Sequence, residues 1–94
     1  MSWPKPMPIV EVEWVDSLHL GGWRSESEWQ GATGPDSLQC RSTGYLYQDN
    51  QDGMVLMQSL SIGGSMADAI EIPRAAVQSV RTLRHGKARE WRSA

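Results

Sequence analysis

Short apolar segments with a period of two alternate along the chain with polar connections rich in glycine, serine and aspartate. The clearest alternation runs from Ile9 to Trp14, where two valines and the tryptophan alternate with Glu11 and Glu13. A period of two is typical of a β-strand with one buried face. This segment is therefore predicted to be the first strand, with Trp14 in the core.

The middle of the chain predicts a β-hairpin. Residues 38–47 are rich in side chains that favour strands, and an apolar run occupies residues 54–60. The polar cluster at 49–53 between them ends in glycine, which is typical of a hairpin turn. We therefore expect these two segments to be the second and third strands and to pair with each other.

The last two strands are expected to flank a single helical turn. Residues 69–72 form a short strand that Pro73 must end, because proline has no N–H to donate to a ladder. Pro73 to Ala76 suits one helical turn, and residues 77–83 resume an extended pattern. This order of elements is that of small SH3-like and Sm-like barrels. The expected fold class is mainly β: a five-stranded SH3-like or Sm-like barrel with one short helical turn before the last strand.

A length of 94 residues allows one hydrophobic core, which we place in a single domain at residues 9–84. Three prolines in residues 1–8 predict a flexible arm outside any sheet, and residues 85–94 form a basic C-terminal tail. A domain this small buries a limited share of its surface, so the chain is expected to form a homo-oligomer.

The lone Cys40 excludes an internal disulfide and a multi-cysteine zinc site. It fits a reducing compartment, so a cytoplasmic location is expected. No apolar run approaches the ~20 residues that span a bilayer, and the N-terminal segment lacks the apolar centre of a secretory signal, so no membrane partner is expected.

The connection between the first two strands is long and is expected to take part in binding. Ser25 and Glu28 have the spacing of a helix-capping box, which predicts one helical turn that the segment 31–37 stops. Trp23 follows two glycines in a polar loop. Its ring is expected either to stack on a ligand or partner, or to fold back and plug one end of the barrel. Trp29 could do either.

The sequence contains no arrangement typical of catalysis. His19 and His85 lie in separate segments, and no serine or cysteine stands in a nucleophile motif. The aspartates at 49 and 52 are interpreted as turn residues, because a calcium loop needs further oxygen ligands. No enzyme activity, metal or cofactor is therefore expected.

Five short motifs, spaced in order between Val10 and Leu83, carry a resemblance. They are V-x-W-x-D-S at 12–17, Gly22-Trp23, T-G-Y-L at 43–46, Gln58-Ser59 and Ile72-Pro73-Arg74. On these motifs the chain resembles a group of small, mostly uncharacterised proteins of bacteriophages and prophages. Such proteins often look like host-takeover or counter-defence factors. The resemblance therefore implies a protein that binds a host protein or sequesters a nucleotide signal.

Six residues form the candidate ligand site, for a small nucleotide-like ligand or a host protein: Asp16, Ser17, Trp23, Gln58, Ser59 and Arg74. Arg74 begins the predicted helical turn, where it could hold an anion; the alternative is a surface ion pair with Glu71 or Asp68. Asp16 and Ser17 could hydrogen-bond a ribose or base edge, or simply cap the loop.

The basic tail gives a second hypothesis, an Sm-like protein that binds nucleic acid. Its candidate residues are Arg84, Lys87, Arg89 and Arg92, with Trp91 among them. Cations mixed with an aromatic ring are typical of single-strand binders, although the acidic body would repel phosphates. A third hypothesis is a structural or adaptor protein of the virion.

Overall fold

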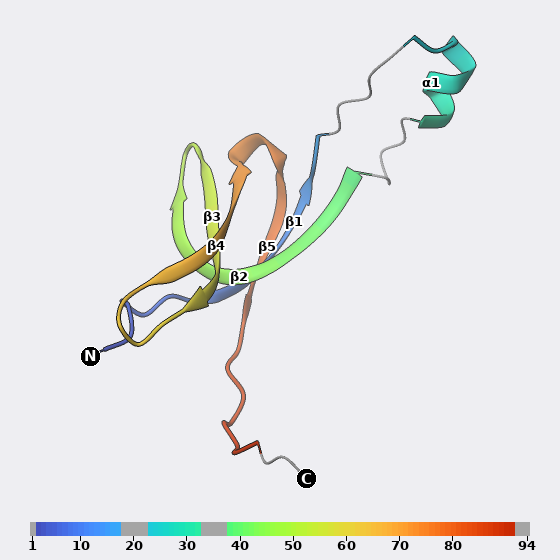
Figure 1. Cartoon of the computed structure of the whole chain (residues 1–94). Helices are drawn as coiled ribbons and strands as arrows, with labels where there is room; N and C mark the ends of the chain where they lie inside the picture. Colours follow the sequence, from blue (N-terminus) through green and yellow to red (C-terminus); the bar gives the residue numbers. More distant parts are fainter. Residues whose placement is uncertain (1, 18–22, 33–37, 92–94) are drawn as a thin grey trace.

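One antiparallel sheet forms the body of the protein. The computed structural model describes residues 2–17, 23–32 and 38–91, and its strands follow the order β4-β3-β2-β1-β5 (Figure 1). The strands are β1 (Ile9–Val15), β2 (Gln39–Asn50), β3 (Gly53–Leu60), β4 (Met66–Pro73) and β5 (Val77–Leu83). Helix α1 (Glu26–Ala32) lies between β1 and β2, and the 3-10 turn η2 (Arg74–Ala76) joins β4 to β5.

The mainly β fold, its five strands and the helical turn before the last strand are confirmed. A closed barrel is not. β4 and β5 are the two edges of the sheet, and each pairs with one neighbour only: β4 with β3, and β5 with β1. The sheet curves strongly, with β2 sweeping across the whole body (Figure 1), yet it stays open between its edges.

The core lies on the inner face of the curved sheet. Its fully or nearly buried members are Val10, Val12, Trp14, Met54, Leu56 and Ile72. The alternation seen in β1 places all three of its core residues on this face, as expected. Trp14 is 9% exposed, and its indole Nε1 donates a hydrogen bond to Ser42 Oγ at 3.0 Å. Its predicted burial is thus confirmed, and its polar atom has a partner.

The N-terminal arm lies outside the sheet but packs against it. Met7 is buried, and the carbonyl oxygen of Pro8 accepts a hydrogen bond from the backbone N–H of Leu46 at 2.8 Å. Lys5 Nζ lies 5.3 Å from the centre of the Tyr47 ring, a cation–π distance. The arm therefore covers part of β2.

Helix α1 begins where the capping box predicts. The hydroxyl of Ser25 accepts a hydrogen bond from the backbone N–H of Glu28 and donates to its carboxylate. The helix ends at Ala32, inside the segment 31–37 that was expected to stop it, but its seven residues make it longer than the single turn expected. Figure 1 shows α1 standing away from the sheet. Within the described ranges, no helix has the length and apolar character needed to cross a membrane.

Candidate functional site

The six residues of the predicted ligand site lie in three places. Asp16 and Ser17 follow the end of β1, and Arg74 lies in η2 at the same end of the sheet, since Trp14 pairs with Val77 directly after η2. Gln58 and Ser59 lie near the opposite end of β3. Trp23 precedes α1 and is fully exposed, so it does not plug the sheet. The structure therefore does not bring the six residues into one site.

Arg74 joins the β2–β3 turn to the corner between β4 and β5. Its guanidinium forms an ion pair with the carboxylate of Asp49, and its Nε donates to the carbonyl oxygen of Asn50 at 3.1 Å. The backbone N–H of Arg74 donates to the carbonyl oxygen of Asp52 at 3.1 Å. An ion pair was one of the alternatives for this residue, but the partner is Asp49 and not Glu71 or Asp68. The role of Arg74 in binding a ligand stays a prediction.

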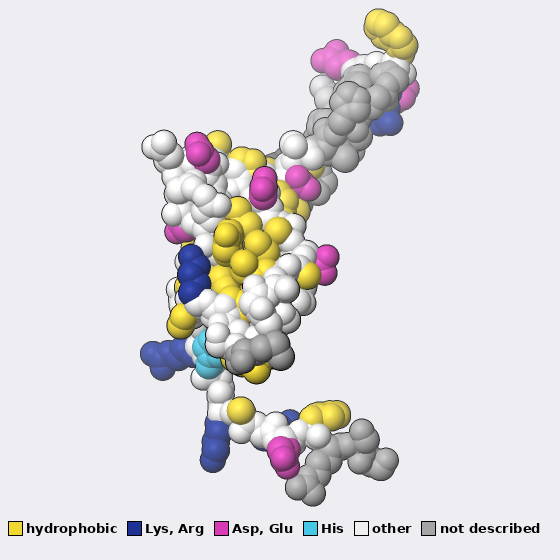
Figure 2. Space-filling view, turned by 60° about the vertical axis from the view of Figure 1, so that its left-hand side comes forward, with side chains coloured by type: hydrophobic (Ala, Val, Ile, Leu, Met, Phe, Trp, Pro, Cys, Tyr) yellow, Lys and Arg dark blue, Asp and Glu magenta, His cyan; other side chains and the backbone are white. Residues whose placement is uncertain are grey.

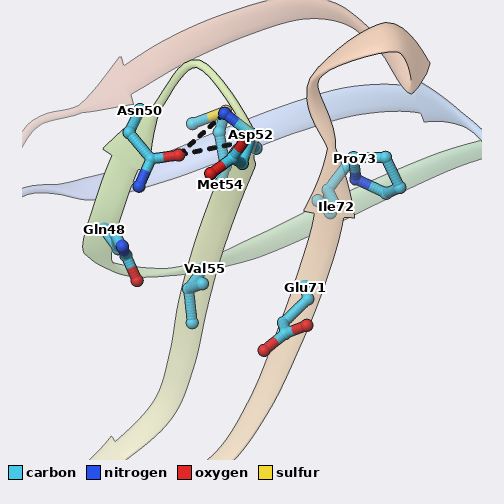
Figure 3. Close-up of a pocket in the computed structure, with 9 residues that line it drawn as sticks. Gln48, Asn50, Asp52, Met54, Val55, Glu71, Ile72 and Pro73 are labelled. Carbon is cyan, nitrogen blue, oxygen red and sulfur yellow. Dashed lines mark hydrogen bonds between the residues drawn. The ribbon is translucent and has the colours of Figure 1, made fainter.

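The turn beside Arg74 borders a shallow hollow of about 310 Å³ (Figure 3). The side-chain oxygen of Asn50 accepts hydrogen bonds from the backbone N–H groups of Asp52 and Gly53, at 2.9 and 3.3 Å. Gln48 and Glu71 flank Val55 on the neighbouring strands β2 and β4. The hollow is lined partly by apolar side chains, and its charged lining residues are the carboxylates Asp52 and Glu71, which disfavour a phosphate.

Asp16 and Ser17 close the start of the loop after β1. The carboxylate of Asp16 accepts a hydrogen bond from the backbone N–H of Ser17 at 2.8 Å, and the N–H of Asp16 donates to the carbonyl oxygen of Leu38, also at 2.8 Å. These contacts fit the capping role that was the alternative to ligand binding. The ligand role of both residues stays a prediction.

Sequence reasoning did not find the opening between the sheet edges, which we call the open seam and define by Ile70 on β4 and by Val77 and Val80 on β5. Val80 is the cross-strand neighbour of Val12 and shares its inner face. Val12 is 0% exposed, whereas Val80 is 46% exposed. Figure 2 shows hydrophobic side chains gathered over the centre of the sheet body. The sequence predicted a strand at residues 77–83 but did not indicate which of its side chains would be exposed.

The basic tail extends away from the sheet (Figure 1). Arg84, Lys87 and Arg89 are exposed, and so is Trp91, at 85%. Arg92 lies outside the described residues. The described part of the tail thus presents three cations and one indole ring to solvent.

Among the residues that the structure describes, no group of three or more histidine, cysteine or acidic side chains is placed to hold a metal ion. Cys40 is half-buried in β2, and its thiol donates to the carbonyl oxygen of Leu38 at 3.5 Å. His85 is exposed, and His19 lies outside the described residues.

Comparison with known proteins finds no matching family model, no significantly similar curated protein and no significantly similar solved structure. The resemblance to phage and prophage proteins therefore stays a prediction.

Proposed function

We propose that the chain is a non-enzymatic binding protein that recognises another protein through the open seam. The contrast between Val12 and Val80 carries this proposal: two cross-strand neighbours on one face, of which one is fully buried and the other 46% exposed. Covering a half-exposed valine contributes about 1 kcal/mol to binding. A partner bound at the seam would also cover the opening between β4 and β5, which a closed SH3-like or Sm-like barrel lacks.

A protein partner fits the described residues better than a nucleotide-like ligand. The predicted ligand residues are spread over three places, and Arg74 is already bonded to Asp49 and to the turn. The hollow beside it is bordered by Asp52 and Glu71, whose negative charges repel a phosphate. The resemblance to phage proteins supports a host protein as one such partner, and the lone Cys40 supports a cytoplasmic setting.

Site-specific photo-crosslinking tests the proposal. A photoreactive phenylalanine analogue replaces Val80 in one variant and Ile62 in another; both native side chains are 46% exposed, but Ile62 lies in the β3–β4 turn. Irradiation in living cells should give discrete adducts at position 80 and none of the same mass at position 62. The adduct's partner, once purified, should bind the wild-type protein and lose about tenfold or more in affinity for Val80→Asp, but not for Ile62→Asp.

Two results would overturn the proposal. One is the absence of a discrete adduct at position 80, or the same adducts at both positions. The other is a response to a small ligand: at 100 times its dissociation constant, a bound nucleotide should raise the apparent unfolding free energy by about 2.7 kcal/mol. A rise of that size with one class of linear or cyclic nucleotide would support nucleotide sequestration as the function instead.

A second candidate function is nucleic-acid binding by the tail, which extends away from the sheet (Figure 1) and in which Arg84, Lys87, Arg89 and the ring of Trp91 are exposed. Backbone phosphates would pair with the cations, and a base would stack on the indole.

A further inference from the structure

The two edge strands of the sheet carry opposite charge. β4 contains Asp68 and Glu71 and no basic residue, whereas β5 contains Arg81 and no acidic residue, with Arg84 directly after its end. The ion pairs that the structure shows among the described residues join Arg41 to Glu11 and Glu13, and Arg74 to Asp49. Within the described part of the chain, none of these ion pairs includes Asp68, Glu71, Arg81 or Arg84, although Arg81 lies opposite Glu11 on β1.

An acidic residue of β4 and a basic residue of β5 lie on the same face of the sheet, and an apolar residue of each strand lies on the other face. Glu71 lies opposite Val55, and Arg81 opposite Glu11, which places both on the outer face of the sheet. Ile70 lies opposite the buried Leu56, and Val80 opposite the buried Val12, which places both on the inner face. If β4 of one sheet continued onto β5 of another, acid would meet base on the outer face. On the inner face, apolar side chains would meet each other.

The edge of β4 that can pair is short. Asp68 has a positive φ of 60°, a left-handed conformation that interrupts a regular strand, and Pro73 has no N–H. Ala69 to Ile72 remain as the regular part of the edge. This stretch contains both Ile70 and Glu71.

We propose that the partner of the open seam is a second copy of this chain, with β4 of one copy pairing with β5 of the next. The inference rests on the proposed function and names its partner. Pairing of β4 with β4, or of β5 with β5, would bring like charges together, which disfavours the symmetric alternatives. Unlike edges join head to tail, so the assembly grows into a closed ring or, where the rotation does not close, a filament.

Charge reversal at the two edges tests the inference. The mass of the intact assembly is measured by light scattering and native mass spectrometry for wild type, Glu71→Lys, Arg81→Glu and the double variant. Wild type should be larger than a monomer, and each single variant should weaken association about tenfold or more. The double variant should assemble again. So should an equimolar mixture of the two single variants, because every contact between unlike copies again joins opposite charges.

Matched controls use the same substitutions away from the edges. Glu26→Lys on α1 and Lys87→Glu in the tail change the net charge equally and should leave the assembly intact. Because Arg81 faces Glu11 within its own chain, Arg81→Gln is added as a variant that weakens the edge without adding like-charge repulsion. Amide hydrogen exchange of the wild type should also show that β5 becomes protected as the protein concentration rises.

The results separate this inference from the proposal on which it rests. A wild-type protein that stays monomeric at every concentration, or an assembly that both edge reversals leave unchanged, overturns the second copy as partner. If position 80 then still crosslinks to a different protein, binding at the seam stands and only the identity of the partner fails. If position 80 gives no discrete adduct and the protein is monomeric, both fail.

Discussion

Arg74 connects parts of the chain that lie far apart in the sequence. Its guanidinium contacts Asp49 and Asn50 in the β2–β3 hairpin, while its backbone N–H bonds to Asp52 in the same turn. The planar guanidinium provides several donors in a fixed geometry, which one lysine ammonium cannot reproduce. Arg74 therefore holds the β2–β3 hairpin against η2.

Replacing Arg74 by alanine should therefore destabilise the fold. About 1 to 2 kcal/mol is expected, because charge-assisted hydrogen bonds are lost but the group is partly exposed and screened. Arg74→Lys should recover less than half of this loss. Urea unfolding followed by circular dichroism measures both. Unchanged stability in Arg74→Ala, together with a lost nucleotide response, would contradict the fastening role and restore the ligand role.

The sequence places Arg74 correctly at the start of a helical turn, but it could not supply the partner of this residue. Glu71 and Asp68 are its nearest acidic residues along the chain, whereas Asp49 is 25 positions away. Only the approach of the hairpin to the η2 corner brings Asp49 within reach. Long-range pairing of this kind depends on how the sheet curves, which alternation alone does not determine.

At the scale of elements, the β2–β3 hairpin meets β4 so closely that one position requires glycine. A Cβ added at Gly53 would lie 2.3 Å from the carbonyl oxygen of Ile72, far inside van der Waals contact. The backbone of β4 would have to move to accommodate it.

Gly53→Ala should accordingly lower the free energy of unfolding by about 2 kcal/mol or more, through backbone displacement and loss of register. Gly86→Ala is the control, because a Cβ at that position meets no atom within 4 Å. Denaturant unfolding of the two variants gives the comparison. Equal stability for both would mean that the hairpin and β4 are not in close contact.

All five strands were predictable, because each has a local apolar pattern bounded by turn residues. The last strand matches its predicted bounds, while β2 extends three residues beyond Tyr47 to Asn50. The opening between β4 and β5 was not predictable. Val77 and Val80 both lie opposite inward-facing residues of β1 because the register shifts between Glu13 and Trp14, a bulge that the period of two does not indicate. Whether another strand covers them depends on the curvature of the whole sheet.

At the scale of the whole molecule, the proposed protein-binding seam lies on the sheet and the alternative nucleic-acid site lies in the tail, so deleting the tail can distinguish them. Deleting residues 85–94 should leave the free energy of unfolding within about 0.5 kcal/mol of the wild type, because Lys87, Arg89 and Trp91 are exposed. The seam is untouched, so binding of a protein partner should persist.

If the tail binds nucleic acid, the same deletion should abolish that binding. The affinity of the full chain should then fall as the salt concentration rises, because cations that contact phosphates release counterions. Fluorescence anisotropy with a labelled single strand measures both effects. Binding that survives the deletion would exclude the tail as the nucleic-acid site.

The distribution of the indoles determines what optical experiments on this protein can detect. Of the tryptophans whose side chains are described, Trp3, Trp23 and Trp91 are between 62 and 105% exposed, and only Trp14 is buried. Intrinsic fluorescence of the folded protein will thus resemble that of indole in water, and the red shift on unfolding will be small. Among these four rings, Trp14, whose indole is bonded to Ser42, is the one whose emission reports on the integrity of the sheet.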